Sequence, residues 1–195
     1  MSTSLDDTIG YDFNEETYLS ISFDLMMLTP FTLTKLTYSP LQTKDDHSLS
    51  IAALRICFNP LEKQLYLISC GNEKSIIFQI LSSEPCQFTR TSYAVEKQKF
   101  HDLNIDNTNS TINIISQDRM IRTYSIKDGK RLRQFIGSLN EDGHLLKMDT
   151  DRNGNLIAVS CTDICVYIWD LNTSECVGFI YGHVEVVADL KFTSC

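Results

Sequence analysis

Short apolar runs separated by polar turns recur along most of this 195-residue chain. The pattern is sharpest between Asn155 and His183, where Leu156–Cys161, Val166–Trp169 and Cys176–Tyr181 follow one another with turn residues between them. Runs of this length and spacing predict neighbouring strands of an antiparallel sheet. Helical periodicity is nearly absent, so the pattern predicts an all-β fold.

The same order of four runs occurs three times, and a fourth round begins near the C-terminal end. The expected strands are Ile51–Phe58, Leu65–Cys70, Lys74–Ile80 and Gln87–Tyr93; then Phe100–Ile105, Ile112–Gln117, Met120–Ile126 and Leu132–Ile136; then Leu145–Thr150, Leu156–Cys161, Cys165–Trp169 and Cys176–Tyr181; and finally Val187–Phe192.

The rounds keep a constant length. The acidic residue of the turn after the second strand stands at Glu73, Asp118 and Asp163, at intervals of 45 residues. The apolar residue three positions later keeps the same interval, at Ile76, Ile121 and Val166. A period of about 40–45 residues with four strands is typical of propeller blades. An ordinary β-sandwich has no reason to keep one.

Two dipeptides, Trp169-Asp170 and Gly182-His183, resemble those of a WD-repeat β-propeller unit. The resemblance predicts four-stranded blades over about residues 47–95, 96–137 and 138–182, and a partial blade over 183–195. A closed ring has ~4–8 blades, so we expect an open, incomplete propeller that needs further blades to close. Residues 1–45 form a poorly assigned N-terminal segment, a possible partial blade with candidate strands at Leu19–Phe23 and Phe31–Tyr38.

WD repeats share a hydrogen-bonding set: a His before the first strand, a Ser or Thr on the second, an Asp in the next turn and a Trp on the third. The resemblance places this set at His47, Ser69 and Glu73 in the first unit, Ser116, Asp118 and Tyr124 in the second, Ser160, Asp163 and Trp169 in the third, and His183 in the fourth. Gln79 takes the Trp position of the first unit, and Glu141 the His position of the third. Because these residues recur at repeat positions, we interpret them as structural rather than as a catalytic triad.

Composition narrows the function. The net charge of −8 gives no electrostatic reason to expect binding to nucleic acid or to an anionic membrane. The one basic cluster, Lys127, Lys130, Arg131 and Arg133, is interpreted as a solvated hairpin tip. The N-terminus lacks the pattern of a signal peptide, and seven cysteines are an odd number. Free thiols in the cytoplasm are therefore expected.

The sequence predicts no metal, no cofactor and no catalytic residue. Asp149–Gly154 matches the first half of an EF-hand loop, but Ser160 stands where the loop needs a bidentate Glu. We interpret this segment as the turn between two strands. Cys161 and Cys165 lack zinc-ligand spacing, and glycine-rich phosphate loops are absent.

Residues from about 47 to 195 resemble the scaffold family of mitogen-activated protein kinase-binding protein 1 and WD-repeat-containing protein 62. The stretches that carry this resemblance are Ser69-Cys70-Gly71, Lys74-Ser75-Ile76, Gln87-Phe88-Thr89-Arg90-Thr91, Gln117-Asp118-Arg119, Gly137-Ser138, Glu141-Asp142-Gly143, Ile157-Ala158, Ser160-Cys161, Glu175-Cys176-Val177 and Gly182-His183 with Glu185. The resemblance implies c-Jun N-terminal kinase pathway and spindle-pole partners, and a cytoskeletal, centrosomal or spindle-pole location.

We therefore expect a non-catalytic protein–protein interaction scaffold, or a fragment of one, whose partner-binding residues are unknown. The kinase-docking region of the family lies beyond its propellers, so no residue here is assigned to it. Two alternatives remain open. One is a WD-repeat subunit of another complex, such as a ciliary or ubiquitin-ligase adaptor. The other is a calcium-dependent propeller hydrolase that uses Asp149 and Asp151.

Overall fold

The computed structural model describes residues 46–60, 62–82, 86–106 and 110–193. The chain divides into two compact units, Met1–Lys44 and Asp45–Cys195, and only the second contains described residues. The strands expected at Leu19–Phe23 and Phe31–Tyr38 lie outside the described residues. The finer division of the chain into repeats stays a prediction.

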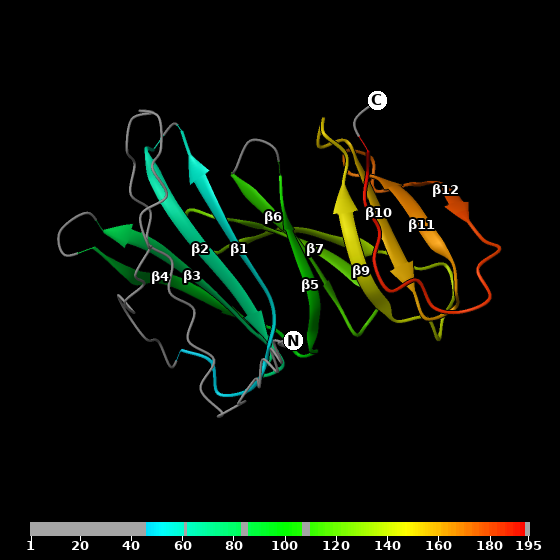
Figure 1. Ribbon diagram of the computed structural model, residues 1–195, viewed down its shortest axis with the longest axis horizontal. Coiled ribbons are helices and arrows are strands. Elements are labelled where there is room, and N and C mark those ends of the chain that lie inside the picture. The colour runs from blue at the N-terminus through cyan, green and yellow to red at the C-terminus, as the bar shows by residue number, and fades with distance from the viewer. Residues whose placement is uncertain (1–45, 61, 83–85, 107–109, 194–195) are drawn as a thin grey trace, which may run out of the picture. The chain divides into compact units, whose positions relative to one another are not determined.

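Three four-stranded antiparallel sheets make up the described part (Figure 1). Sheet 1 contains β1 (Ile51–Asn59), β2 (Gln64–Gly71), β3 (Ser75–Ser82) and β4 (Gln87–Val95); sheet 2 contains β5 (Phe100–Ile105), β6 (Thr111–Ser116), β7 (Met120–Ser125) and β8 (Arg131–Ile136); sheet 3 contains β9 (Leu145–Thr150), β10 (Leu156–Cys161), β11 (Val166–Asp170) and β12 (Cys176–Ile180). Each sheet follows the chain order from its first strand to its fourth. The predicted all-β architecture of three four-stranded blades is confirmed, and these sheets do not close into a barrel.

We call sheets 1, 2 and 3 blades 1, 2 and 3. The blades stack through their first strands, because β1 lies beside β5 and β5 lies beside β9. The middle residues of the second and third strands are mostly buried on both faces, as stacking between neighbouring blades requires. Ile68, Ile114 and Val159, on the second strands, are all fully buried. Phe78 on β3 faces blade 2, since a side chain at Gly129 of that blade would meet its ring.

Asp102 joins the first strands of all three blades. Its Oδ1 atom accepts a hydrogen bond from the amide of Leu103 at 2.9 Å and lies 3.4 Å from the Arg55 guanidinium on β1. Its Oδ2 atom accepts one from the Met148 amide on β9 at 3.3 Å. The side chain is only 4% exposed, so this carboxylate needs all of these donors.

The strand expected at Val187–Phe192 is not a strand in the structure. No described strand lies beyond it to complete a hydrogen-bonded ladder. The segment still runs next to blade 3 (red in Figure 1), where the Asp149 carboxylate accepts hydrogen bonds from Lys191 Nζ at 3.0 Å and the Phe192 amide at 2.8 Å. It occupies the place of a first strand without having a sheet of its own.

The turn between second and third strands has the same backbone in every blade. The residue after the acidic position is left-handed each time: Lys74 has φ 72°, Arg119 65° and Ile164 62°. This conformation costs an L-residue about 1–2 kcal/mol, and a β-branched side chain such as that of Ile164 suits it least. The fixed turn geometry therefore imposes strain where the sequence places isoleucine.

Replacing Ile164 by glycine is expected to stabilise the protein by roughly 0.5–1 kcal/mol, because glycine adopts positive φ without strain. Ile164 is 39% exposed, so its side chain contributes only part of its surface to the core. Urea unfolding followed by circular dichroism measures the change. Val177→Gly, at an exposed position of β12, is the control and should destabilise. A fall in midpoint for Ile164→Gly as large as that of the control would contradict the assigned turn.

Candidate functional site: polar networks between blades and a groove across the first strands

In blade 1, His47, Ser69 and Glu73 meet between the chain entering the blade and its second turn. His47 Nε2 lies 2.7 Å from Ser69 Oγ, and His47 Nδ1 pairs with the Glu73 carboxylate. Burial opposes ionisation of Glu73, but hydrogen bonds from Ser75 and His47 outweigh it and lower the pKa of its carboxyl. The order Ser–His–carboxylate is that of a hydrolase triad, yet the Ser69 hydroxyl lies inside β2 on a residue only 6% exposed. The arrangement ties the chain to the blade.

In blade 2 a guanidinium takes the place of the imidazole. Arg122 on β7 donates two hydrogen bonds to the Asp118 carboxylate, at 3.0 and 2.5 Å, and also contacts Ser116. Ser116 Oγ donates to Asp118 Oδ1 at 2.6 Å. Burial opposes ionisation of Asp118, but these donors outweigh it and lower the pKa of the carboxyl.

Glu96 completes the blade 2 network from the segment before β5. It stands seven residues before Leu103, as His47 stands seven before Leu54, so it occupies the histidine position. Its Oε2 atom forms an ion pair with Arg122 Nε at 3.7 Å, and its Oε1 atom accepts a hydrogen bond from Tyr124 at 2.6 Å. Burial and the Glu96 hydrogen bond raise the pKa of Tyr124 far above its usual range. A carboxylate at the histidine position thus has a buried cation opposite it.

Blade 3 uses a third arrangement. Tyr167 on β11 donates a hydrogen bond to Asp163 at 2.6 Å, while Ser160 Oγ accepts one from the Lys147 amide at 3.1 Å. Burial and the Asp163 hydrogen bond also raise the pKa of Tyr167 far above its usual range. Ser160 and Asp163 therefore serve separate partners. Glu141, at the histidine position, is exposed.

In each blade, the residue at the Trp position of the third strand donates a hydrogen bond to the segment that enters that blade. Gln79 donates to Asp46 at 2.5 Å, and Tyr124 donates to Glu96 as described. Trp169 donates from Nε1 to the Gly137 carbonyl at 3.0 Å. Its ring packs on Phe135 of blade 2 with centroids 5.9 Å apart. Different side chains thus make the same connection in all three blades.

Residues that lie four positions after the acidic turn residue were missed by the sequence reasoning. They are Ile77, Arg122 and Tyr167, at intervals of 45 residues. Alignment of the three rounds would have shown a cation and a hydroxyl at this position where the first round has isoleucine. His183, assigned to the set of a fourth blade, is exposed.

The half EF-hand segment has its carboxylates already paired. Asp151 Oδ1 accepts hydrogen bonds from the amides of Asn155 and Leu156 at 2.7 and 2.8 Å, which is how an Asp side chain stabilises a turn. Asp149 accepts from Asn104 at 3.0 Å besides Lys191 and Phe192. Within residues 46–60, 62–82, 86–106 and 110–193, no group of three or more His, Cys, Asp or Glu side chains is placed to hold a metal ion.

The basic cluster is paired with acids and carbonyls. Lys127 forms an ion pair with Glu62 at 3.1 Å and Lys130 with Asp128, also at 3.1 Å. Arg131 and Arg133 turn toward their own and the next blade, where they meet the Glu96 carboxylate and the Leu171 carbonyl. The cluster joins neighbouring segments and does not form an isolated cationic patch.

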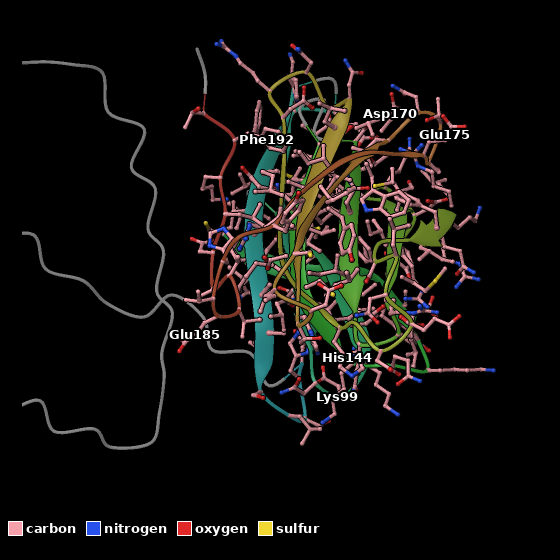
Figure 2. The ribbon with its side chains drawn as sticks, turned by 90° about the vertical axis from the view of Figure 1, so that its right-hand side faces the viewer. Lys99, His144, Asp170, Glu175, Glu185 and Phe192 are labelled. Carbon is pink, nitrogen blue, oxygen red and sulfur yellow. The ribbon has the colours of Figure 1, made fainter. Side chains whose placement is uncertain are left out.

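A groove of about 490 Å³ crosses the beginnings of the first strands. It is lined by residues of all three blades and of the C-terminal segment: Ala52, Asn72, Phe100, His101, Leu146, Lys147, Val186, Val187 and Ala188. We call it the channel groove. Figure 2 shows Lys99, His144 and Glu185 toward one end of the sheets, and Asp170, Glu175 and Phe192 toward the other. The groove is mostly apolar, with the partly exposed Lys147 amine on its wall.

No protein-family profile matches the chain. WD repeat-containing protein 62 from Sus scrofa is 37% identical over 158 residues, and mitogen-activated protein kinase-binding protein 1 from Mus musculus is 42% identical over 159 residues. Each match covers 80% of this chain. The chain is a homologue of these WD-repeat proteins.

The WD-repeat chain spans only 10% of the length of each of these relatives. The similarity therefore supports WD-repeat blades, and it does not carry over the activity of the whole relatives. Within the part of the chain that the structure describes, no helix is long and apolar enough to cross a membrane.

Proposed function

We propose that this chain is a non-catalytic protein-interaction scaffold and that it binds a partner in the channel groove. The observation that carries the proposal is the composition of the groove: three blades and the C-terminal segment each contribute residues to one mostly apolar groove. Apolar surface with a few polar groups is typical of peptide and ligand sites. The polar groups include the Lys147 amine, which lies 3.9 Å from the Asp102 carboxylate and is partly exposed.

The polar residues that suggest chemistry are engaged in structural contacts, which supports the non-catalytic part of the proposal. His47, Ser69 and Glu73 bind one another within blade 1. Asp149 and Asp151, the carboxylates that a calcium-dependent hydrolase would need, are paired with Lys191 and with turn amides.

A displayed peptide library selected on the purified chain tests the groove. Peptides that bind the native chain are expected to lose at least about tenfold in affinity for Ala188→Arg, which fills the groove with a long cation. Gln134→Arg, which introduces the same cation at an exposed position on β8, is the control and should bind normally. Selected peptides that bind Ala188→Arg unchanged would contradict the groove, and a failure to select any peptide would contradict the scaffold function.

We extend the proposal to the pathway that the relatives suggest. One relative is named for binding a mitogen-activated protein kinase, so we propose that this chain works in complexes of the c-Jun N-terminal kinase pathway, in the cytoplasm and at spindle poles. The kinase itself is not assigned to the channel groove. Imaging of the tagged chain in dividing cells tests the location: signal at the poles supports the proposal, and an even distribution contradicts it.

A further inference from the structure

A second cleft, of about 430 Å³, lies between blades 2 and 3 beside the linker that joins them. We call it the linker cleft. Its lining includes Arg119 from the turn before β7, Ile136 from the end of β8, Leu139 and Glu141 from the linker, and Trp169 and Ser174 from blade 3. The linker cleft shares no lining residue with the channel groove, so the two are separate surfaces.

The linker that leads into blade 3 is twice as long as the one that leads into blade 2. It spans residues 137–144, whereas residues 96–99 join β4 to β5. On the cleft, Leu139 is 60% exposed and Ile136 is 47% exposed. Trp169, which already packs on blade 2, extends this apolar surface inward. The cleft is therefore an open continuation of the contact between blades 2 and 3.

Glu141 of the lining occupies the same repeat position as Glu96, 45 residues earlier. In blade 2, three side chains of the blade contact the Glu96 carboxylate. They are the guanidinium groups of Arg122 at 3.7 Å and Arg131 at 2.8 Å, and the Tyr124 hydroxyl at 2.6 Å. A carboxylate at this position is thus the acceptor for two arginines of the same blade.

Blade 3 has none of these three side chains at the equivalent positions, 45 residues later. It has Tyr167, Cys176 and Trp169 there. Tyr167 donates its hydrogen bond to Asp163, and Trp169 donates to a carbonyl of the linker, so both donors are already used. Glu141 is exposed, and within the part of the chain that the structure describes it forms no ion pair. The cleft thus has the acceptor without the arginines.

Carboxylates outnumber cations at the cleft. Glu175 is exposed and directly follows Ser174 of the lining, so it adds a second negative charge to that of Glu141. Arg119 is the cation of the lining, and its guanidinium donates to the Asn140 carbonyl at 2.9 Å. The net charge of −8 also favours the approach of a cationic segment. The cleft therefore complements a segment that is both apolar and basic.

We propose that the linker cleft is the docking site for a short segment of a partner protein in which an arginine stands next to an apolar side chain. The arginine pairs with Glu141, as the arginines of blade 2 pair with Glu96. The apolar side chain packs against Leu139 and Ile136. Arginine suits this place better than lysine, because its planar fork binds a carboxylate through two hydrogen bonds. The proposal does not depend on what the channel groove binds.

Random peptides displayed on phage and selected on the native chain test the proposal. Peptides that bind Ala188→Arg as well as the native chain are kept, because they bind outside the channel groove. These peptides are expected to carry an arginine beside an apolar residue. Their affinity should fall at least about fivefold for Glu141→Gln, which removes the charge, and for Leu139→Ser, which removes the apolar contact.

Each variant has a matched control outside the cleft. Asp142→Asn removes a charge from the next residue of the linker, and Leu132→Ser shortens a leucine of β8 that is 57% exposed. Both controls should bind the peptides within about twofold of the native chain. Circular dichroism melts confirm that each variant is folded.

A charge exchange tests the pairing itself. A peptide whose arginine is replaced by glutamate should lose its affinity for the native chain and regain it for Glu141→Arg. Three results would overturn the proposal: no peptide that binds outside the channel groove, selected peptides without a basic residue, or peptides that bind Glu141→Gln and Leu139→Ser as tightly as the native chain.

Discussion

Replacement of Trp169 by alanine is expected to destabilise the protein by about 3–5 kcal/mol, as for other large core aromatics. The side chain is only 5% exposed, packs on Phe135 and donates its hydrogen bond to Gly137, so truncation leaves both a cavity and an unpaired carbonyl between blades 2 and 3. Urea unfolding followed by far-ultraviolet circular dichroism is the suitable measurement, since Trp169 is the only tryptophan of the chain.

Two further variants separate the hydrogen bond of Trp169 from the packing of its ring and provide an exposed control. Trp169→Phe keeps most of the apolar ring but removes the donor, and the loss should include about 1–3 kcal/mol for the unpaired buried carbonyl. Tyr181→Ala, at a side chain 74% exposed, should change stability by no more than about 0.5 kcal/mol. A loss well under one kcal/mol for Trp169→Ala would show that β11 does not face blade 2.

Replacement of Arg122 by methionine is expected to cost up to about 3–5 kcal/mol, because it leaves the partly buried Asp118 carboxylate without its cation and leaves Glu96 with Arg131 alone. Arg122 is 7% exposed as a side chain and pairs with both Asp118 and Glu96. Methionine retains the length of the stem, so the loss reports the charge rather than the volume. Lys127→Met, which breaks the exposed pair with Glu62, is the control and should cost at most about 1 kcal/mol.

The cost of Arg122→Met should depend on pH. The pKa of Asp118 is lowered in the folded native chain, so its stabilisation is present above the unfolded pKa of about 4 and is lost as pH falls through the folded value. The variant lacks the main partner of Asp118, so protonation of Asp118 removes less stabilisation from it than from the native chain. The difference between native chain and variant should therefore narrow below about pH 4. A difference that stays constant down to pH 2 would show that the guanidinium acts through packing alone.

Much of the fold could be predicted from the sequence because the repeat signal is local. Turn residues such as Asp118 and Asp163 recur at 45-residue intervals, and the apolar runs between them are the right length for strands. The strand expected at Val187–Phe192 shows the limit of this reasoning. Its pattern is that of a strand, but a strand also needs a hydrogen-bonding neighbour, which a single segment does not reveal.

The side chains that connect the blades were harder to predict. The WD-repeat set pointed to His47, Ser69 and Glu73, which the structure brings together. The set gave no reason to pair Glu96 with Arg122. A carboxylate at the histidine position looks like the loss of a hydrogen-bonding residue, unless the compensating cation on the third strand is also recognised. The channel groove left no signal either, since its residues come from strand ends that meet only when the blades stack.

The central claim is that each blade connects its entering segment to its own sheet through buried polar contacts, with different side chains in equivalent places. A double-mutant cycle on Glu96→Gln and Arg122→Met tests it most directly, because these two residues replace the imidazole contact of blade 1. We predict a coupling free energy of at least about 1 kcal/mol at pH 7, with the double variant more stable than the sum of the single losses implies. Additive losses, with a coupling below about 0.3 kcal/mol, would contradict the claim.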